Sequence, residues 1–225
     1  MCGRFTLTAH DDALADAFSF TQADLGWVPS YNIAPTQQVL VVTNDGSENR
    51  AHQMRWGLVP SWAKDASIGN RMINARAETA AEKPSFRTAF KKRRCLVLAD
   101  SYYEWKKTSG KKTPMRIMVG DGELFAFAGL WGYWRPSDDE GILSCTIVTT
   151  AANSFMETIH NRMPVILPRE SAEAWLDPSI EDAATVSELL LPYDSDAMIA
   201  HEVSTFVNSP RNNTPDCIAP VQSLL

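Results

Sequence analysis

The segment Cys95-Leu-Val-Leu-Ala-Asp-Ser-Tyr-Tyr-Glu-Trp105 predicts a buried β-strand that ends in aromatic residues. Further strands are expected before and after it, over residues 38–43 and 52–56 around an Asn44-Asp45-Gly46 turn, and over residues 115–119, 124–129, 143–149 and 199–206. Strands thus follow strands more often than they alternate with helices. This order predicts an α+β fold with a mainly antiparallel, partly barrel-like sheet.

Helices are expected at the periphery of this sheet. Thr8 and Asp11 have the spacing of a capping box, which predicts a short helix through Ala17. Pro84 near a first turn predicts a helix over residues 84–93. Three more are expected over residues 151–160, 170–176 and 180–191. The sequence shows no internal repeat and no low-complexity linker, so residues 1–225 are predicted to form a single domain.

The charge of the chain is unevenly distributed. Lys and Arg total 21 against 27 Asp and Glu, a net charge of -6, which taken whole argues against a nucleic-acid-binding protein. Residues 50–116 nevertheless hold 16 of the basic residues and five acids, a net +11, while the remainder carries five basic residues and 22 acids, a net -17. This asymmetry predicts one basic face on an acidic body, placed around Cys2. For residues 91–94 the alternative to a DNA-binding role is that these cations stabilise the C-terminus of their own helix, where the helix dipole favours positive charge.

Several classes of protein are excluded by what the sequence lacks. No apolar run approaches the roughly 20 residues of a membrane span, and the N-terminus has no signal-peptide core, so a cytoplasmic protein without membrane association is expected. The four cysteines form no C-x-x-C pair and the four histidines no H-x-x-x-H pair. We therefore expect no metal site, no cofactor and no disulfide framework. A monomer is the default expectation.

Cys2 has the most distinctive chemistry. A small second residue is the usual condition for removal of the initiator Met, which would give Cys2 a free α-amine beside its thiol. The α-amine has a pKa of about 8, against about 10.4 for Lys, so far more of it is neutral and nucleophilic near pH 7. The thiol can then close a five-membered ring on the same carbon. Cys2 therefore predicts capture of an aldehyde as an imine and then a thiazolidine, the alternative being a buried or merely processed cysteine.

A second chemistry also uses this position. N-terminal-nucleophile amidotransferases begin Met-Cys-Gly and use the freed amine as the base for the thiol. They also need an Asn-Gly dipeptide for the oxyanion hole, and this chain contains none. An amidohydrolase or peptidase acting through Cys2 is thus kept as the alternative function. A non-catalytic nucleic-acid-binding module is a third.

A set of motifs in a fixed order resembles a known family. They are Met1-Cys-Gly-Arg-Phe5, Tyr31-Asn-Ile-Ala-Pro-Thr-Gln37, Arg55-Trp-Gly-Leu-Val-Pro-Ser-Trp-Ala-Lys64, Ile73-Asn-Ala-Arg-Ala-Glu-Thr79, Arg94-Cys-Leu-Val-Leu-Ala-Asp-Ser-Tyr-Tyr-Glu-Trp105, Phe127-Ala-Gly-Leu-Trp131 and His160-Asn-Arg-Met-Pro164. Together they resemble the SOS-response-associated peptidase (SRAP) family over nearly the whole chain, from residue 2 to about 208.

The resemblance implies a sensor of abasic sites in single-stranded DNA, active in the DNA damage response. In such a protein the N-terminal Cys2 crosslinks to the ring-opened sugar aldehyde and shields the lesion from strand cleavage. The expected partner is single-stranded DNA containing abasic sites. Lyase-type imine chemistry accompanies this activity, whereas the family name records an older proposal of peptidase or autoproteolytic action.

The motif positions also imply the catalytic set, which is Cys2, Asn74, Glu104 and His160. Imine formation needs a group that moves protons, and a carboxyl beside aromatic residues can serve as a general acid and base. His160 is expected to protonate the sugar ring oxygen or steady the amine, and Asn74 to orient the amine or the lesion. Each residue also has a structural alternative. Glu104 could be solvated at a strand end, His160 could bond to backbone at the C-terminus of a helix, and Asn74 could cap a turn.

The remaining predicted site residues contact DNA. Arginines match phosphate oxygens, hydroxyls add contacts at a strand end, and an exposed indole stacks on a base. The set is Arg4, Asn32, Pro35, Trp62, Arg76, Trp105, Thr149 and Arg162. Surface ion pairs are the alternative for each arginine. Trp56, Trp131 and Trp134 are expected in the core.

Overall fold

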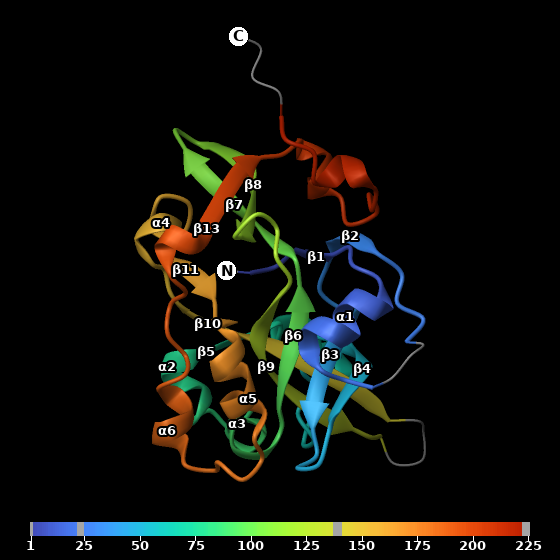
Figure 1. Cartoon of the computed structure of the whole chain (residues 1–225). Coiled ribbons are helices and arrows are strands. Elements are labelled where there is room, and N and C mark those ends of the chain that lie inside the picture. Colours follow the sequence, from blue (N-terminus) through green and yellow to red (C-terminus); the bar gives the residue numbers. More distant parts are fainter. Residues whose placement is uncertain (1, 22–24, 137–140, 222–225) are drawn as a thin grey trace.

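The computed structural model describes residues 2–21, 25–136 and 141–221. It consists of two sheets with short helices at their edges (Figure 1). The smaller sheet has the order β13 (Met198–Glu202), β8 (Lys111–Val119), β7 (Ser101–Thr108), β1 (Phe5–Leu7) and β2 (Ser30–Ile33). The larger has the order β11 (Arg162–Pro164), β10 (Ile142–Ala151), β4 (Asn49–Trp56), β3 (Gln38–Asn44), β6 (Arg94–Ala99), β9 (Phe125–Trp134) and β12 (Ile166–Leu167).

The larger sheet closes on itself. β9 pairs with β10 over residues 129–134, so β10, β4, β3, β6 and β9 form a five-stranded barrel. A short strand, β5 (Asn74–Arg76), lies beside β10. The pairings within both sheets are antiparallel, except that β10 runs parallel to β4 and to β5. The predicted α+β fold with a mainly antiparallel, partly barrel-like sheet is therefore confirmed.

Aromatic residues fill the core between barrel and sheet. The Phe5 ring contacts Trp56 and Phe127 edge to face, with centroid separations of 5.2 and 5.7 Å. Gly129 allows close packing inside the barrel, because a Cβ there would lie 2.8 Å from Cys95 Sγ. Trp56 and Trp134 are buried as predicted, whereas Trp131 is only partly buried. Burial of such large rings is the main favourable contribution to folding.

The strand predicted over residues 95–105 is two strands in two different sheets. The chain bends at Asp100, whose carboxylate accepts hydrogen bonds of 2.6 Å from both the amide and the hydroxyl of Thr8. The Asp100 amide donates to the carbonyl of Thr6 at 3.0 Å. These bonds tie the bend to the first strand, so β6 stays in the barrel and β7 enters the smaller sheet.

The capping box predicted at Thr8 and Asp11 is wrong. Helix α1 (Asp11–Phe18) begins after His10, which makes no side-chain capping bond. The Thr8 side chain bonds to Asp100, as described above. The hydroxyl thus binds a tertiary acceptor in place of the local helix amide, which sequence spacing cannot reveal.

The other helices are shorter than predicted, apart from α5 (Arg169–Leu176), which agrees within a residue. The expected helix at 84–93 is α3 (Arg87–Lys92), and those at 151–160 and 180–191 are α4 (Ser154–Glu157) and α6 (Ala183–Ser187). Asn153 and Asp182 cap the last two and set their starts. The helix α2 (Ala77–Ala80) was not expected. The last strand, β13, ends at Glu202 instead of residue 206, and a 3-10 turn, η3 (Thr205–Asn208), follows.

Arg94 is one basic residue whose role is structural. Its guanidinium is buried and donates to the carbonyls of Phe90 and Lys91 at the end of α3, at 3.0 and 2.9 Å. It also donates to the Trp175 carbonyl at the end of α5, at 2.6 Å. A cation at two helix C-termini neutralises their exposed carbonyls. No helix of the described residues has the length and apolarity needed to cross a membrane.

Candidate active site around Cys2

Strand pairing around β10 assembles four of the predicted site residues. β5 runs alongside β10 with Asn74 opposite Ile147 and Arg76 opposite Thr149. On its antiparallel edge, β10 pairs Ala151 with Arg162 of β11. Asn74, Arg76, Thr149 and Arg162 are therefore brought to one end of the barrel by backbone register.

Cys2 is fully buried, and its backbone is hydrogen-bonded to Asn74, one of these four residues. Asn74 Nδ2 donates a hydrogen bond of 2.8 Å to the Cys2 carbonyl oxygen. The other amide atom, Asn74 Oδ1, is buried and has no hydrogen-bond partner among the described residues. A buried acceptor without a partner costs about 1–3 kcal/mol, so Asn74 is well placed to receive a proton donor from a bound molecule.

Strand β7 brings a carboxyl group to the same cysteine. Alternate residues of a strand face the same side, so Tyr102 and Glu104 share one face and Tyr103 lies on the other. Glu104 is only 4% exposed. Burial raises the pKa of the Cys2 thiol, and the negative charge of Glu104 raises it further. The thiol is thus neutral at physiological pH and lies within the electrostatic influence of the Glu104 carboxyl group.

His160 lies in the turn before β11. The Arg162 amide donates to His160 Nδ1 at 3.0 Å, and the same nitrogen lies 3.2 Å from the Arg162 carbonyl oxygen, so the backbone of Arg162 fixes the orientation of the ring. The Arg162 guanidinium binds both carboxylate oxygens of Glu78 and donates to the Thr149 carbonyl at 2.6 Å. This arginine, expected to bind phosphate, already has a charged partner within the protein.

The buried residues Arg4 and Asn32 form a separate network with the partly buried Trp105. Arg4 donates to Asn32 Oδ1 at 2.7 Å and to the Val207 carbonyl at 2.8 Å, and its guanidinium lies 5.9 Å from the centroid of the Trp105 ring. The Trp105 indole donates to Asn208 Oδ1 at 2.8 Å. These contacts hold η3 against the smaller sheet. Their assignment as DNA contacts remains a prediction.

Trp62 projects from a loop that is firmly held. Its side chain is 57% exposed, while the loop bonds through the Leu58 amide to the Met72 carbonyl at 3.1 Å and through the Ala63 carbonyl to the Trp134 indole at 2.7 Å. Gly57 permits a close approach there, since a Cβ would lie 2.5 Å from the Gly69 carbonyl. An exposed indole on a rigid loop suits stacking, because little entropy is lost on binding. Pro35 is half-buried in the turn that bonds to Trp56.

The β7–β8 hairpin extends outward from Glu104 and carries four lysines, Lys106, Lys107, Lys111 and Lys112. Lys106 lies two residues beyond Glu104, or about 7 Å along the strand. Lys107 and Lys112 face each other in the register, an arrangement of like charges that destabilises a hairpin. Within the described part of the chain, no acid forms an ion pair with any of the four. Arg71 is also exposed, three residues before Asn74.

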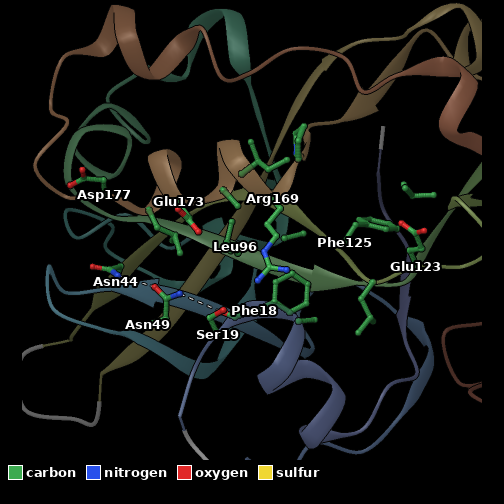
Figure 2. A pocket seen from close by; sticks show the side chains of 18 of the residues that line it. Phe18, Ser19, Asn44, Asn49, Leu96, Glu123, Phe125, Arg169, Glu173 and Asp177 are labelled. Carbon is green, nitrogen blue, oxygen red and sulfur yellow. Dashed lines mark hydrogen bonds between the residues drawn. The ribbon is translucent and has the colours of Figure 1, made fainter.

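A cavity lined by α1 and α5 lies elsewhere. Its volume is about 810 Å³. Figure 2 shows that Arg169 and Glu173 of α5 and Phe18 of α1 line it. None of the predicted site residues lines it. Nor does any cluster of three or more potential metal ligands occur among the described residues. The candidate site therefore consists of Cys2 and the side chains on the neighbouring strands, such as Asn74 of β5 and Glu104 of β7.

Comparison with known proteins places the chain in a family. The model of the SOS response associated peptidase (SRAP) family matches residues 1–210, and the chain belongs to this family. It is 50% identical to the abasic site processing protein YoqW of Bacillus subtilis, over 97% of this chain and 99% of that protein. It is 31% identical to the abasic site processing protein HMCES of Xenopus tropicalis, over 98% of this chain and 78% of that protein.

The fold agrees with this assignment. A crystal structure of a protein from Bacteroides thetaiotaomicron superposes with a TM-score of 0.88 and 28% identity, covering 98% of this chain and 100% of that one. Two residues that contact the site were missed by the sequence analysis, namely Tyr102 and Glu78. Tyr102 could have been found from the two-residue period that it shares with Glu104, whereas no local signal pairs Glu78 with Arg162.

Proposed function

We propose that the protein, once Met1 is removed, captures the aldehyde of an abasic site in single-stranded DNA and holds it as a thiazolidine on Cys2. The observation that carries this proposal is the position of Cys2, which is bonded through its carbonyl to Asn74 and lies within the electrostatic influence of Glu104. The names of the relatives, abasic site processing proteins, support the substrate class.

The first step joins the amine to the lesion. The neutral α-amine of Cys2 attacks the aldehyde carbon of the ring-opened sugar, and the carbinolamine then loses water to give a protonated imine. The Glu104 carboxylate takes the proton that the Cys2 α-ammonium loses on becoming nucleophilic and passes it to the departing hydroxyl, and His160 assists opening of the sugar ring. Asn74 orients the amine, since its Nδ2 already fixes the Cys2 backbone.

The second step closes the ring. The thiol proton of Cys2 passes to the Glu104 carboxylate, Sγ bonds to the imine carbon, and the electron pair of the C=N bond returns to nitrogen. The product is a neutral thiazolidine and a protonated Glu104. Ring closure removes the imine, from which β-elimination would otherwise cleave the DNA strand. A shielding protein therefore needs a rate of thiazolidine closure that exceeds the rate of β-elimination.

DNA is held by backbone contacts with little sequence preference. The four lysines of the β7–β8 hairpin and exposed Arg71 and Arg76 supply positive charge beside the site. Trp62 supplies a stacking platform, and Arg162 and Thr149 border the lesion. The acidic remainder of the chain discourages nonspecific coating of DNA.

The test is incubation of Met1-free protein with a single-stranded oligonucleotide carrying one abasic site, followed by a denaturing gel. A retarded covalent band is expected for the wild type and none for Cys2→Ala. Cys2→Ser should give a weaker, hydrolysis-prone imine, because a hydroxyl closes the ring poorly. Cys217→Ser is the matched control, because Cys217 is a buried cysteine near the other end of the sequence. Its thiol donates a hydrogen bond to the Asn212 carbonyl, and a serine hydroxyl at this position can donate to the same carbonyl. An equal band with Cys2→Ala, or Met1 retained on active protein, refutes the proposal.

A further inference from the structure

Tyr102 is a buried polar residue that the proposed reaction leaves without a role. It is fully buried on β7, and its hydroxyl has no hydrogen-bond partner among the described residues. The neighbouring Tyr103, on the other face of the strand, donates to the Tyr31 carbonyl at 2.7 Å and lies 3.3 Å from that of Cys217. The Tyr103 hydroxyl thus has hydrogen-bond partners within the described residues, whereas the Tyr102 hydroxyl has none there.

The hydroxyl of Tyr102 belongs to the surroundings of Cys2. Tyr102 and Glu104 lie on one face of β7, and Tyr102 pairs with Phe5 of β1, the strand that Cys2 precedes. The side chains of Tyr102 and Cys2 are both fully buried in the main core, and Cys2 acts electrostatically on the Tyr102 hydroxyl. The ring is fixed by an edge-to-face contact with Phe127, at a centroid separation of 6.0 Å. A fixed ring holds its hydroxyl in one place, which is what a preorganised donor requires.

We infer that Tyr102 is a positioning residue whose hydroxyl donates a hydrogen bond to Cys2 Sγ as the sulfur becomes negatively charged during ring closure. The inference rests on the proposed function. A buried hydroxyl costs stability when it has no partner, and one that gains its partner only in the transition state lowers the barrier instead. Glu104 takes the proton from sulfur, and Tyr102 keeps its own.

Electrostatics support the direction of this hydrogen bond. Burial raises the pKa of Tyr102 well above its ordinary value, and the charges of Cys2 and Glu104 raise it further. Tyr102 is therefore protonated at every pH at which the reaction runs and can only donate toward an anion. The ionisable side chain that raises the pKa of the Cys2 thiol is Glu104. The ionisable side chains that raise the pKa of Tyr102 are Cys2 and Glu104.

The substitution Tyr102→Phe removes only the hydroxyl and keeps the contact with Phe127. The expected result is ring closure that is about tenfold slower at neutral pH, with more imine trapped by borohydride, because one hydrogen bond to a developing charge is removed. The pH–rate curve should move to higher pH, while thermal stability is unchanged or higher. Tyr103→Phe is the matched control: it loses a satisfied hydroxyl, so it should lower the melting temperature and leave ring closure unchanged.

A second measurement needs no DNA. Alkylation of Cys2 by iodoacetamide, followed by mass spectrometry of the N-terminal peptide, should be about tenfold slower in Tyr102→Phe than in the wild type and in Tyr103→Phe, because the thiolate loses its donor. Equal alkylation and closure rates in all three proteins would overturn the role of Tyr102. If the wild type forms no crosslink but alkylation slows in Tyr102→Phe alone, the proposed function fails and the hydrogen bond stands.

Discussion

The side-chain amide of Asn74 donates a hydrogen bond of 2.8 Å to the carbonyl of Cys2, across 72 residues of sequence. It joins the first residues of the chain to β5 and so to the end of the barrel. Because the bond fixes the backbone of Cys2, it also fixes the direction of the α-amine that the proposed reaction uses. The remaining amide oxygen of Asn74 has no partner among the described residues, and the proposed reaction assigns it to the bound lesion.

Replacement of Asn74 tests this relationship. Asn74→Ala should slow crosslinking at least tenfold, because it removes both the backbone anchor and the free acceptor, and should destabilise the fold by about 1 kcal/mol. Asn74→Asp keeps an acceptor but cannot donate to the Cys2 carbonyl, so it should also crosslink slowly. Single-turnover rates and thermal melts measure the two effects. A wild-type rate in Asn74→Ala would show that Cys2 needs no such anchor.

The lysine hairpin should contribute to DNA affinity at a cost in stability. Lys107→Gln with Lys112→Gln should weaken noncovalent binding to single-stranded DNA. The slope of log affinity against log salt should become shallower by about 0.7 for each phosphate that the lysines no longer neutralise. The double substitution should also stabilise the fold by about 0.2–1 kcal/mol, because two like charges no longer face each other.

The matched control for the hairpin is Lys91→Gln with Lys92→Gln on α3, which changes the net charge equally. Fluorescence anisotropy over a salt series compares the two proteins. An equal decrease in affinity in both would mean that total charge, and not the hairpin, governs binding.

Trp62 should matter for binding far more than for folding. Trp62→Ala is expected to lower affinity for single-stranded DNA by about 1–3 kcal/mol, the contribution of one stacked base, with a change in unfolding free energy within about 0.5 kcal/mol. Trp62→Phe should recover part of the affinity. For contrast, Trp56→Ala in the core should cost about 3–5 kcal/mol of stability. Unchanged affinity in Trp62→Ala would remove this residue from the binding surface.

The ion pair between Glu78 and Arg162 should make a small, pH-dependent contribution to stability. The hydrogen bond from Arg162 lowers the pKa of Glu78 below its ordinary value of 4.5. Because the folded state has the lower pKa, this stabilisation is present above pH 4.5 and is lost as the pH falls through the folded value. The Glu78 side chain is half exposed, so the effect should stay below about 1 kcal/mol. Melting temperatures of Glu78→Gln and wild type should differ at pH 7, and the difference should shrink as the pH falls below 4.5 and through the folded pKa of Glu78. A constant difference would contradict this origin.

Local sequence determined the positions of several of the longer strands and the family to which the motifs belong. The apolar segments at 38–43 and 143–149 were enough to place β3 and β10, because a short apolar run rich in β-branched residues predicts a buried strand from its own composition. The motif order identified the family and named Asn74 and Glu104. Neither step required knowledge of how the strands pair.

Tertiary structure decided where those segments go and which polar groups remain available. Asp100 divides one apolar run between two sheets because Thr6 and Thr8 supply its hydrogen bonds. Strands of three residues, such as β1 and β5, are too short to show a period and form only against their partners. Arg4 is occupied by Asn32, while the hydroxyl of Tyr102 finds no hydrogen-bond partner in the described part of the chain. Such partnerships join residues distant in the chain, so packing and backbone register decide them, not local pattern.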